Sequence, residues 1–540
     1  MLNFFSMAQS ITSPLKISIF RNIWIANMVS NIGTWMHEVG AGWLMATMSS
    51  DPLLVSLVQT ALFLPSFFLI LPAGAIADLV DRRKLLIFAI AWMLIIACFC
   101  AFFAFTSLVT PRTLLTLTFC LGIGSAIYLP VMASIMPDIV PKEYLVNALT
   151  LNSISQNITR TIGPVIAGYL IALSGPWVVF SANALSFLII LFVIFSYKHK
   201  QPRSSLPSER FFGAIKNGFA YVKQTPEIKS ILLIAGSFFL SISSIFSFMP
   251  LIIRQEMGLG PESYGLVVTS MGLGAVITGI FLPKIRERYD PKSIASISFL
   301  IGLLCILSVN YTRIFPLLLA SMALVGIAWI SMISTMQVAL QLALTSWIRA
   351  RGLSMFYATF MGSMALGGIG WGLIANNSSI TTALNIALTF GVFSLYIFRK
   401  RNLPQPLESF DSDTQEADHL SLLPHSSSEQ VMINVEYMIK EEDATEFEKL
   451  MRDVRRLRLR NGAIAWGLYK DLEVEHRYVE HFIDESWVEH LRRHQRQSVD
   501  RNDPLIKVNA LHMKDEKPRV SHYLSRSAPR RIKKWRELID

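Results

Sequence analysis

Long apolar segments follow one another through the first 401 residues, and short polar stretches separate them. A helix needs about 20 predominantly apolar residues to cross the hydrocarbon core of a bilayer. The pattern therefore predicts an all-α polytopic membrane protein with twelve transmembrane helices. We expect the spans near residues 20–46, 52–77, 85–107, 112–136, 144–173, 177–197, 229–253, 260–283, 292–311, 314–342, 347–375 and 379–398.

The longest polar stretch between two spans, residues 198–228, divides the predicted helices into two sets of six. We expect an N-terminal six-helix half at 1–197, a central cytoplasmic loop at 198–228 and a C-terminal six-helix half at 229–401. The halves resemble each other weakly, because each contains a charged turn that leads into a helix with late glycines. Repeated halves are typical of transporters that rock around a central binding site.

The pattern changes after residue 401. Residues 402–428 are polar and predict a linker, and residues 527–540 form a basic tail. Between them, residues 429–526 have the β-α-β-β-α-β order of a soluble α+β ferredoxin-like domain, and we expect this domain to form homodimers through an open sheet face. The strands are expected near 431–439, 463–470, 476–483 and 520–524, and the helices near 443–460 and 486–497.

Charge indicates the surroundings and the orientation of the chain. Charged residues make up 16% of the sequence, against about 25% in soluble domains, so we expect a lipid bilayer around most of it. The loops on one side of the membrane hold 22 Lys and Arg residues and those on the other hold 3. Because cytoplasmic loops carry the basic excess, we expect a bacterial cytoplasmic (inner) membrane protein with both termini cytoplasmic.

The basic charge does not indicate a nucleic-acid partner. The net charge is +14 over residues 1–401 and −3 over residues 402–540, so it belongs to the membrane loops. No cofactor is expected, and no phosphate-binding loop for ATP occurs. No metal site is expected either: His490 and His494 share a helix face, but the arginines between them disfavour a cation.

A short polar segment between the second and third spans carries the most specific motif. It reads Gly74-Ala-Ile-Ala-Asp78-Leu-Val-Asp-Arg82-Arg83-Lys84. This segment resembles the loop between the second and third helices of the major facilitator superfamily, which gates the cytoplasmic side. The resemblance implies a cytoplasmic gate formed by Gly74, Asp78, Arg82 and Arg83.

Two charged residues lie deep within predicted spans, where charge is costly and usually functional. Glu38 lies about 18 residues into the first span and Arg160 about 16 residues into the fifth, so their depths agree within about one helical turn. We hypothesise that they face one cavity and that Glu38 is a proton-coupling group. The alternative is a static ion pair that fixes helix packing.

Other polar residues within the spans are candidates for the wall of a substrate cavity. Each of them could instead form a helix–helix hydrogen bond. His37 is interpreted as a polar contact, with a proton relay as the alternative. The candidates are Asn27, Asn31, Gln59, Tyr128, Asn152, Gln156, Gln337, Gln341 and Tyr357.

The fifth span contains Gly163-Pro164, which predicts a break in the helix because proline removes a backbone donor and glycine permits close approach. The pair resembles the core of the antiporter motif of major facilitator exporters. The earlier glycines of that motif are absent, and so is the arginine motif of the fourth span.

The tail also carries a resemblance. The segments Arg458-Leu-Arg-Asn-Gly-Ala463 and Glu480-x-Phe482-x-x-x-x-Trp487-x-x-His490, together with Trp466, are similar to antibiotic-biosynthesis monooxygenase domains. A major facilitator transporter with such a tail resembles the enterobactin-exporter-like branch, the transmembrane secretion effectors. The resemblance implies proton-coupled export of a small amphipathic molecule, such as a siderophore or drug, and no enzyme activity. A tail-regulated importer or uniporter of a metabolite, and a membrane-tethered monooxygenase-like enzyme, are the alternatives.

Overall fold

A computed structural model describes residues 12–196, 225–344, 346–401, 403, 429–460, 462–487, 489–490, 504–513 and 518–525. Internal contacts divide the chain into two compact units, one with most of the long helices and one with the C-terminal sheet, and each is described by itself. Most of the predicted central loop, the linker and the basic tail lie outside the described residues.

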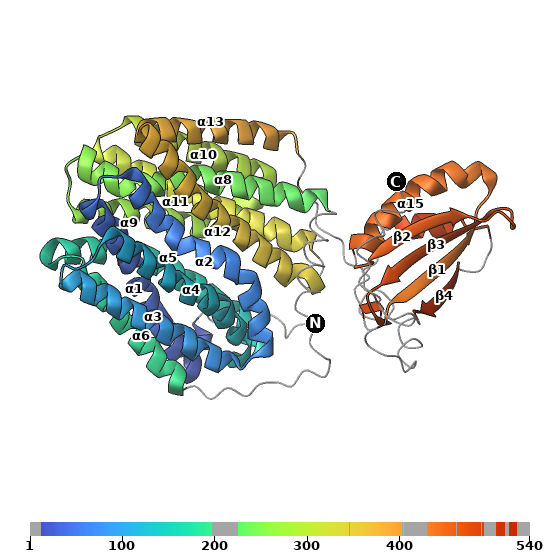
Figure 1. Ribbon diagram of the computed structural model, residues 1–540, viewed down its shortest axis with the longest axis horizontal. Coiled ribbons are helices and arrows are strands. Elements are labelled where there is room, and N and C mark those ends of the chain that lie inside the picture. The colour runs from blue at the N-terminus through green and yellow to red at the C-terminus, as the bar shows by residue number, and fades with distance from the viewer. Residues whose placement is uncertain are drawn as a thin grey trace, which may run out of the picture. The chain divides into compact units, whose positions relative to one another are not determined.

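The described residues contain twelve long helices that run roughly along one direction (Figure 1). Short connections join consecutive helices within each half. The first half holds α1 (Ser18–Met48), α2 (Pro52–Leu79), α3 (Arg82–Phe105), α4 (Pro111–Ile139), α5 (Leu145–Ser174) and α6 (Trp177–Ser196). The second half holds α8 (Pro226–Leu251), α9 (Pro261–Arg286), α10 (Pro291–Tyr311), α11 (Phe315–Ala343), α12 (Ser346–Asn377) and α13 (Ile380–Arg399).

Local sequence explains where several of these helices begin. Asp51 accepts a hydrogen bond from the Leu53 amide at the start of α2, and Asp81 accepts from the Arg83 and Lys84 amides at the start of α3. A side-chain oxygen at this position satisfies backbone donors that have no partner within the helix. Polar turns thus end one apolar helix and start the next.

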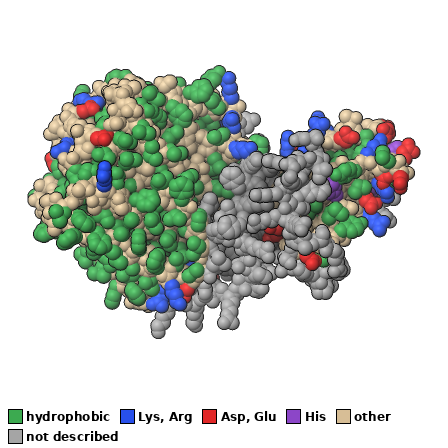
Figure 2. Space-filling view, viewed as in Figure 1, with side chains coloured by type: hydrophobic (Ala, Val, Ile, Leu, Met, Phe, Trp, Pro, Cys, Tyr) green, Lys and Arg blue, Asp and Glu red, His purple; other side chains and the backbone are tan. Residues whose placement is uncertain are grey.

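Ten of these helices are long and apolar enough to cross a membrane. The other two long helices in the described part of the chain are α1 and α5, which carry Glu38 and Arg160. Apolar side chains cover the visible face of the helical unit (Figure 2), and Phe68, Phe105 and Phe192 are among those exposed. So much exposed apolar surface is expected where lipid, not water, surrounds a protein. The chain is therefore a multi-pass membrane protein.

The C-terminal unit contains a small antiparallel sheet. Its strands are β1 (Val431–Met438), β2 (Ala465–Lys470), β3 (Arg477–Asp484) and β4 (Arg519–Leu524), in the order β2-β3-β1-β4. In the register, Val435 lies opposite Glu480 of β3 and Val520 of β4. The described strands agree with the predicted ones to within two residues at each end.

A helix, α15 (Ala444–Arg460), connects β1 to β2 and covers one face of this sheet. Its Phe447, Met451 and Val454 pack with alternate residues of β1, such as Ile433 and Val435. The two-residue period of a strand places these apolar residues on one face. A short helix, α17 (Pro504–Ala510), precedes β4, and most of the predicted helix at 486–497 lies outside the described residues.

Candidate functional site

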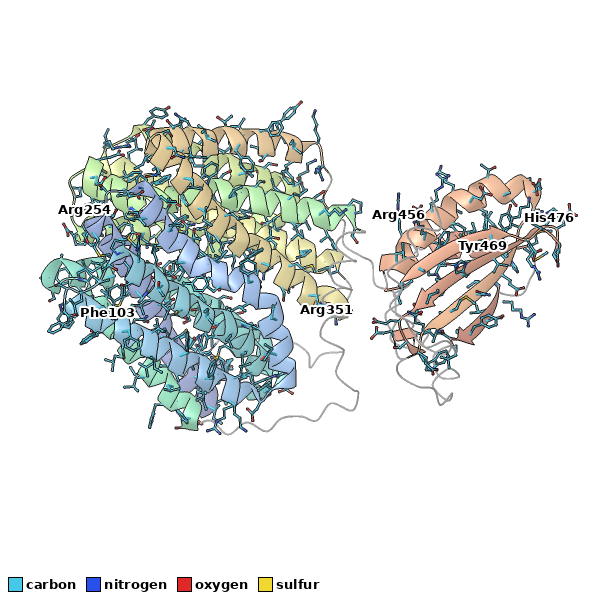
Figure 3. All side chains as sticks on the ribbon, in the orientation of Figure 1. Phe103, Arg254, Arg351, Arg456, Tyr469 and His476 are labelled. Carbon is cyan, nitrogen blue, oxygen red and sulfur yellow. The ribbon has the colours of Figure 1, made fainter. Side chains whose placement is uncertain are left out.

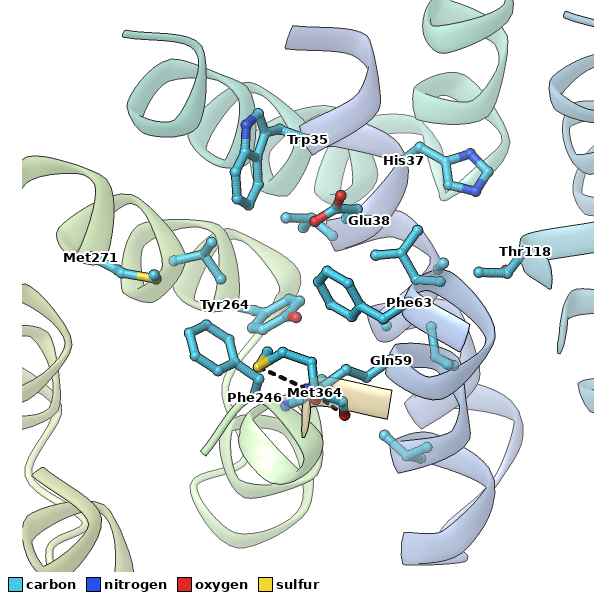
Figure 4. Close-up of a pocket in the computed structure, with 18 of the residues that line it drawn as sticks. Trp35, His37, Glu38, Gln59, Phe63, Thr118, Phe246, Tyr264, Met271 and Met364 are labelled. Carbon is cyan, nitrogen blue, oxygen red and sulfur yellow. Dashed lines mark hydrogen bonds between the residues drawn. The ribbon is translucent and has the colours of Figure 1, made fainter. Parts of the chain in front are cut away.

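A cavity of about 140 Å³ lies between the two halves of the helical unit. Helices α1, α2, α4 and α5 of the first half and α8, α9, α11 and α12 of the second contribute its walls (Figure 4). The walls are largely apolar and aromatic, with a few polar groups, as is usual for small-molecule sites. The residues that line it include Trp35, His37, Glu38, Gln59, Phe63, Thr118, Arg160, Phe246, Tyr264, Met271, Trp329 and Met364.

Glu38 of α1 and Arg160 of α5 both line this cavity. Their charges interact, but no ion pair within 4.0 Å joins the two side chains. The guanidinium carbon of Arg160 lies 5.4 Å from the centre of the Trp35 ring, and its Nε and Nη1 atoms are buried without a hydrogen-bond partner. The arrangement therefore leaves both charged groups available to a proton or to another molecule.

Gln59 is a second polar group of the cavity wall, and it bridges the two halves. Its Nε2 donates to the Met364 carbonyl oxygen of α12 at 3.3 Å (Figure 4). Its Oε1 accepts from Ser247 Oγ of α8 at 3.1 Å. The adjacent Thr60 donates from Oγ1 to the Ala365 carbonyl oxygen at 2.9 Å. These hydrogen bonds join α2 to the second half beside the cavity.

The halves also meet at the end of the bundle where α1 is followed by α2, called here the α1–α2 end. Arg254 follows α8 in a π-helical segment (Ile252–Glu256) and donates to the Ala46 carbonyl oxygen of α1 at 2.7 Å (Figure 3). The rings of Trp43 and Tyr264 stack with their centroids 6.2 Å apart. Contacts between the two halves therefore exist at the α1–α2 end.

The predicted helix break at Gly163-Pro164 is not present, since α5 continues through both residues to Ser174. The segment serves instead in close helix packing. A Cβ added at Gly265 of α9 would lie 2.5 Å from the Pro164 carbonyl oxygen and 3.0 Å from Gly168 Cα. Small residues thus let α5 and α9 cross closely. Proline is tolerated inside membrane helices because neighbouring groups can satisfy the backbone.

Of the nine predicted cavity residues, Gln59 lines this cavity and the other eight do not. Tyr128 donates to Asn27 Oδ1 at 2.7 Å within the first half, and Gln337 donates from Nε2 to Tyr357 Oη at 2.9 Å within the second. Their role as substrate contacts remains a prediction. The eight are Asn27, Asn31, Tyr128, Asn152, Gln156, Gln337, Gln341 and Tyr357.

The predicted gate motif lies at the opposite end of α2. Arg82 Nη1 forms an ion pair with Asp138 of α4 at 2.9 Å and donates to the Ser134 carbonyl oxygen. Arg83 donates to the Ile194 and Phe195 carbonyl oxygens at the end of α6. Gly74 and Asp78 belong to the last turns of α2, and the surroundings of these two residues lie outside the described part of the chain.

Sequence reasoning missed several residues that these contacts bring in. Asp138 could have been identified from the sequence. It is an acidic residue near the end of a predicted span, on the same side of the membrane as the basic loop that contains Arg82. No sequence pattern marks Tyr264 and Trp329 as cavity residues, because an aromatic residue inside an apolar helix looks the same in the sequence whether it faces lipid, core or cavity.

The C-terminal unit contains a buried charged cluster. Arg458 of α15 donates to Glu480 of β3 through Nε at 2.9 Å and through Nη2 at 3.1 Å, and Trp466 and Tyr437 donate to the same carboxylate. Burial raises the pKa of Glu480, but the Arg458 charge and these hydrogen bonds outweigh it and hold the pKa below its ordinary value. The arrangement is that of a structural ion pair in which both carboxylate oxygens of Glu480 accept two hydrogen bonds each.

His490, which is predicted to share a helix face with His494, is fully buried. His490 Nδ1 lies 2.9 Å from Asp484 Oδ2, and its ring packs against Trp487 and His522. His494 lies outside the described residues. Among the residues that the structure describes, no group of three or more His, Cys, Asp or Glu side chains is placed to hold a metal ion.

Comparisons with known proteins agree with this architecture. The chain is 25% identical over 279 residues to the staphyloferrin A transporter of Staphylococcus aureus, covering 50% of this chain and 69% of that one. It is 21% identical over 322 residues to the enterobactin exporter EntS of Shigella boydii, covering 59% and 75%. The crystal structure of the nucleoside transporter NupG superposes with a TM-score of 0.56 at 16% identity, covering 71% of this chain and all of that one, and supports the fold.

The family signature spans far more of the chain than any of these relatives. The pattern of the family described as transmembrane secretion effector matches residues 9–530. The family is one of major facilitator transporters, and the two similar sequences are named as a transporter and an exporter, so the chain is a secondary transporter and not an enzyme. The chain belongs to the transmembrane secretion effector family of the major facilitator superfamily.

Proposed function

We propose that the protein exports a small amphipathic molecule across the bacterial inner membrane in exchange for protons. The observation that carries this proposal is the cavity between the halves, which is lined by Glu38 of α1 and Arg160 of α5. Among the long helices that the structure describes, these two are the ones outside the ten that are apolar enough to cross a membrane. Charged groups inside a membrane are costly and are retained where they move protons or substrate.

Transport of the substrate is coupled to proton movement because the proton and the substrate compete for the charged groups of one cavity. When Glu38 is ionised, its charge and that of Arg160 balance. When Glu38 takes a proton, the balance is lost, and the interactions available to the substrate change. A site that exposes Glu38 to each side of the membrane in turn then exchanges a proton from one side for a substrate from the other.

Topology and span number form part of the same proposal. We infer that α1 and α5 cross the membrane with the ten more apolar helices, giving twelve spans with both termini cytoplasmic. The basic loops support this orientation. The α1–α2 end is then the periplasmic end, and the gate motif at Arg82 and Arg83 is cytoplasmic. Closure of the periplasmic end corresponds to a state that receives substrate from the cytoplasm.

The substrate class rests on the cavity and on the relatives. Aromatic and aliphatic side chains such as Trp35, Phe63 and Phe246 suit an apolar body, and Glu38 and Arg160 suit a polar group. Among the similar proteins are a staphyloferrin A transporter, a macrolide efflux protein and an enterobactin exporter. We therefore propose a siderophore or a drug-like molecule as the substrate.

The test is proton flux in proteoliposomes with an acidic interior. A panel of siderophores and macrolides is added outside, and a trapped dye reports the internal pH. We expect substrate-dependent proton release with wild type, loss of at least about tenfold with Glu38→Gln, and no loss with Glu262→Gln, an exposed acid at the start of α9. Substrate uptake without proton movement would point to a uniporter, and retained coupling in Glu38→Gln would remove Glu38 from the proposal.

For the C-terminal unit, we propose a ferredoxin-like domain of the monooxygenase-like type, with domain limits near 429 and 526. The strand order β2-β3-β1-β4 and the crossing helix α15 support this assignment. Alternate residues of β1, namely Met432, Asn434 and Glu436, are partly exposed on the face opposite α15. We propose that this face pairs with that of a second copy.

A further inference from the structure

A groove of about 330 Å³ lies between α8 and α13 on the outside of the helical unit. It is separate from the central cavity, since no residue lines both. Its rims are exposed apolar side chains, among them Leu233 of α8 and Phe393 of α13. Its floor is buried and includes Ile234 and Phe398. Because lipid surrounds the exposed apolar surface of a membrane protein, the groove opens toward the acyl chains of the bilayer.

The two helices meet closely at one end of this groove and leave it open at the other. A Cβ added at Gly391 of α13 would lie 3.0 Å from Ser241 Oγ of α8. The lining residues of α8 all precede Ser241, and those of α13 run from Phe390 toward the helix end at Arg399. That stretch of α13 is roughly 14 Å long, against about 15 Å for half of the hydrocarbon core of a bilayer. The groove therefore matches the depth of the acyl chains in one leaflet.

The open end of the groove is positively charged. Arg401 is exposed and lines the groove together with the apolar rims. Arg399 and Lys400, which directly precede it, are exposed as well. None of the described residues that line the groove is acidic. Long basic side chains at the end of a membrane helix reach the level of the lipid headgroups. One groove thus combines a cation at headgroup level with an apolar channel below it.

The first half has a groove in the equivalent place, which lacks this charge. It lies between α1 and α6, the first and last long helices of that half, as α8 and α13 are of the second. Its volume is about 180 Å³, and none of the described residues that line it is charged. These residues are Ile19, Asn22, Ile23, Phe192, Val193 and Ser196. The α1–α6 groove is therefore a natural control for the effect of Arg401.

We propose that the α8–α13 groove binds one molecule of an anionic phospholipid. An acyl chain lies between the helices, and the phosphate lies beside Arg401. A basic residue at the membrane surface attracts a lipid with a net negative charge. A zwitterionic lipid gains less, because its own ammonium group balances its phosphate. The site is distinct from the cavity that holds Glu38, and it does not depend on the proposed substrate or on proton coupling.

Native mass spectrometry of the full chain in detergent tests this site. The probes are dioleoyl-phosphatidylglycerol and dioleoyl-phosphatidylcholine, which share their acyl chains and differ in net charge. The test variants are Arg401→Gln, which removes the charge, and Ser394→Phe, which places a ring in the groove. The matched controls are Arg288→Gln, at an exposed base beyond the end of α9, and Ser196→Phe, in the α1–α6 groove.

For wild type, we expect the first phosphatidylglycerol to bind about fivefold more tightly than the first phosphatidylcholine. Arg401→Gln should lose this preference through weaker binding of phosphatidylglycerol alone. Ser394→Phe should weaken the binding of both lipids, because the ring occupies the space of the acyl chain. Arg288→Gln and Ser196→Phe should both bind the two lipids as wild type does.

Equal affinity of wild type for the two lipids would overturn the proposal, and absence of binding counts as equal affinity. A preference that survives in Arg401→Gln would overturn it too. So would weaker binding in Ser196→Phe with none in Ser394→Phe, which would move the lipid to the other groove. Because Arg401 is exposed, Arg401→Gln decides the matter even if Ser394→Phe does not fold. The measurements use no substrate and no proton gradient, so their outcome is independent of the flux experiment.

Discussion

Glu480 accepts hydrogen bonds from Arg458, Trp466 and Tyr437 and is fully buried. We expect Glu480→Gln to lower the free energy of unfolding of the C-terminal unit by about 3 kcal/mol, because Arg458 stays buried without its counter-charge. Hydrogen exchange of the β3 amides in the full chain measures the effect. Glu475→Gln, at an exposed carboxylate, is the control and should be neutral. Equal protection in Glu480→Gln and wild type would argue against a structural role.

The same residue predicts a pH dependence. The pKa of Glu480 is held below its ordinary value of 4.5, because the Arg458 charge and the hydrogen bonds outweigh the effect of burial. A lowered carboxyl pKa gives stability that is present above the ordinary pKa and is lost as pH falls through the folded-state pKa. We expect protection of the β3 amides to fall below about pH 4 and to fall less in Glu480→Gln.

At the scale of elements, the crossing of α5 and α9 depends on Gly265. A Cβ there would lie 2.5 Å from the Pro164 carbonyl oxygen, which is backbone and cannot turn aside. We expect Gly265→Ala to separate the two helices and to lower the unfolding temperature by several degrees. Gly370→Ala of α12 is the matched control, because an added Cβ meets nothing within 4 Å.

The same variant tests closure of the α1–α2 end. In a background without the native cysteines, a cysteine placed at Val268 in the cavity wall is labelled by a membrane-impermeant maleimide. We expect faster labelling from the α1–α2 end in Gly265→Ala than in the control. Unchanged labelling would mean that the α5–α9 crossing does not hold that end closed.

At the scale of the whole molecule, the proposed pairing of C-terminal domains predicts a dimer. Ile483 of β3 lies opposite Met432 of β1 and Ala465 of β2, on the face away from α15. We expect Ile483→Lys to halve the mass of the full chain measured by light scattering in detergent, because a charge would be buried between two sheets. Leu472→Lys, at a turn residue that is 99% exposed, should keep the dimer. A monomeric wild type would contradict the pairing.

Much of the architecture follows from local sequence. Apolar runs of the right length predicted helices such as α3 and α10, and capping by Asp51 and Asp81 explains two of the sharp starts. Alternation predicted β1 and β3. These signals are local, since burial periodicity and end-capping depend on residues close in the chain. The matching depths of Glu38 and Arg160 could likewise be counted along two helices, and the two residues line one cavity.

The partners of polar groups were decided by the tertiary structure. Length and hydropathy place a residue at a depth in the membrane, but they do not give the rotation of a helix or the helix it faces. Tyr128 and Gln337 therefore turned out to bond within their own halves, while Gln59 joins the halves beside the cavity. Gly163-Pro164 signals a special position in the sequence, yet only packing shows a close crossing with α9 where a break was expected.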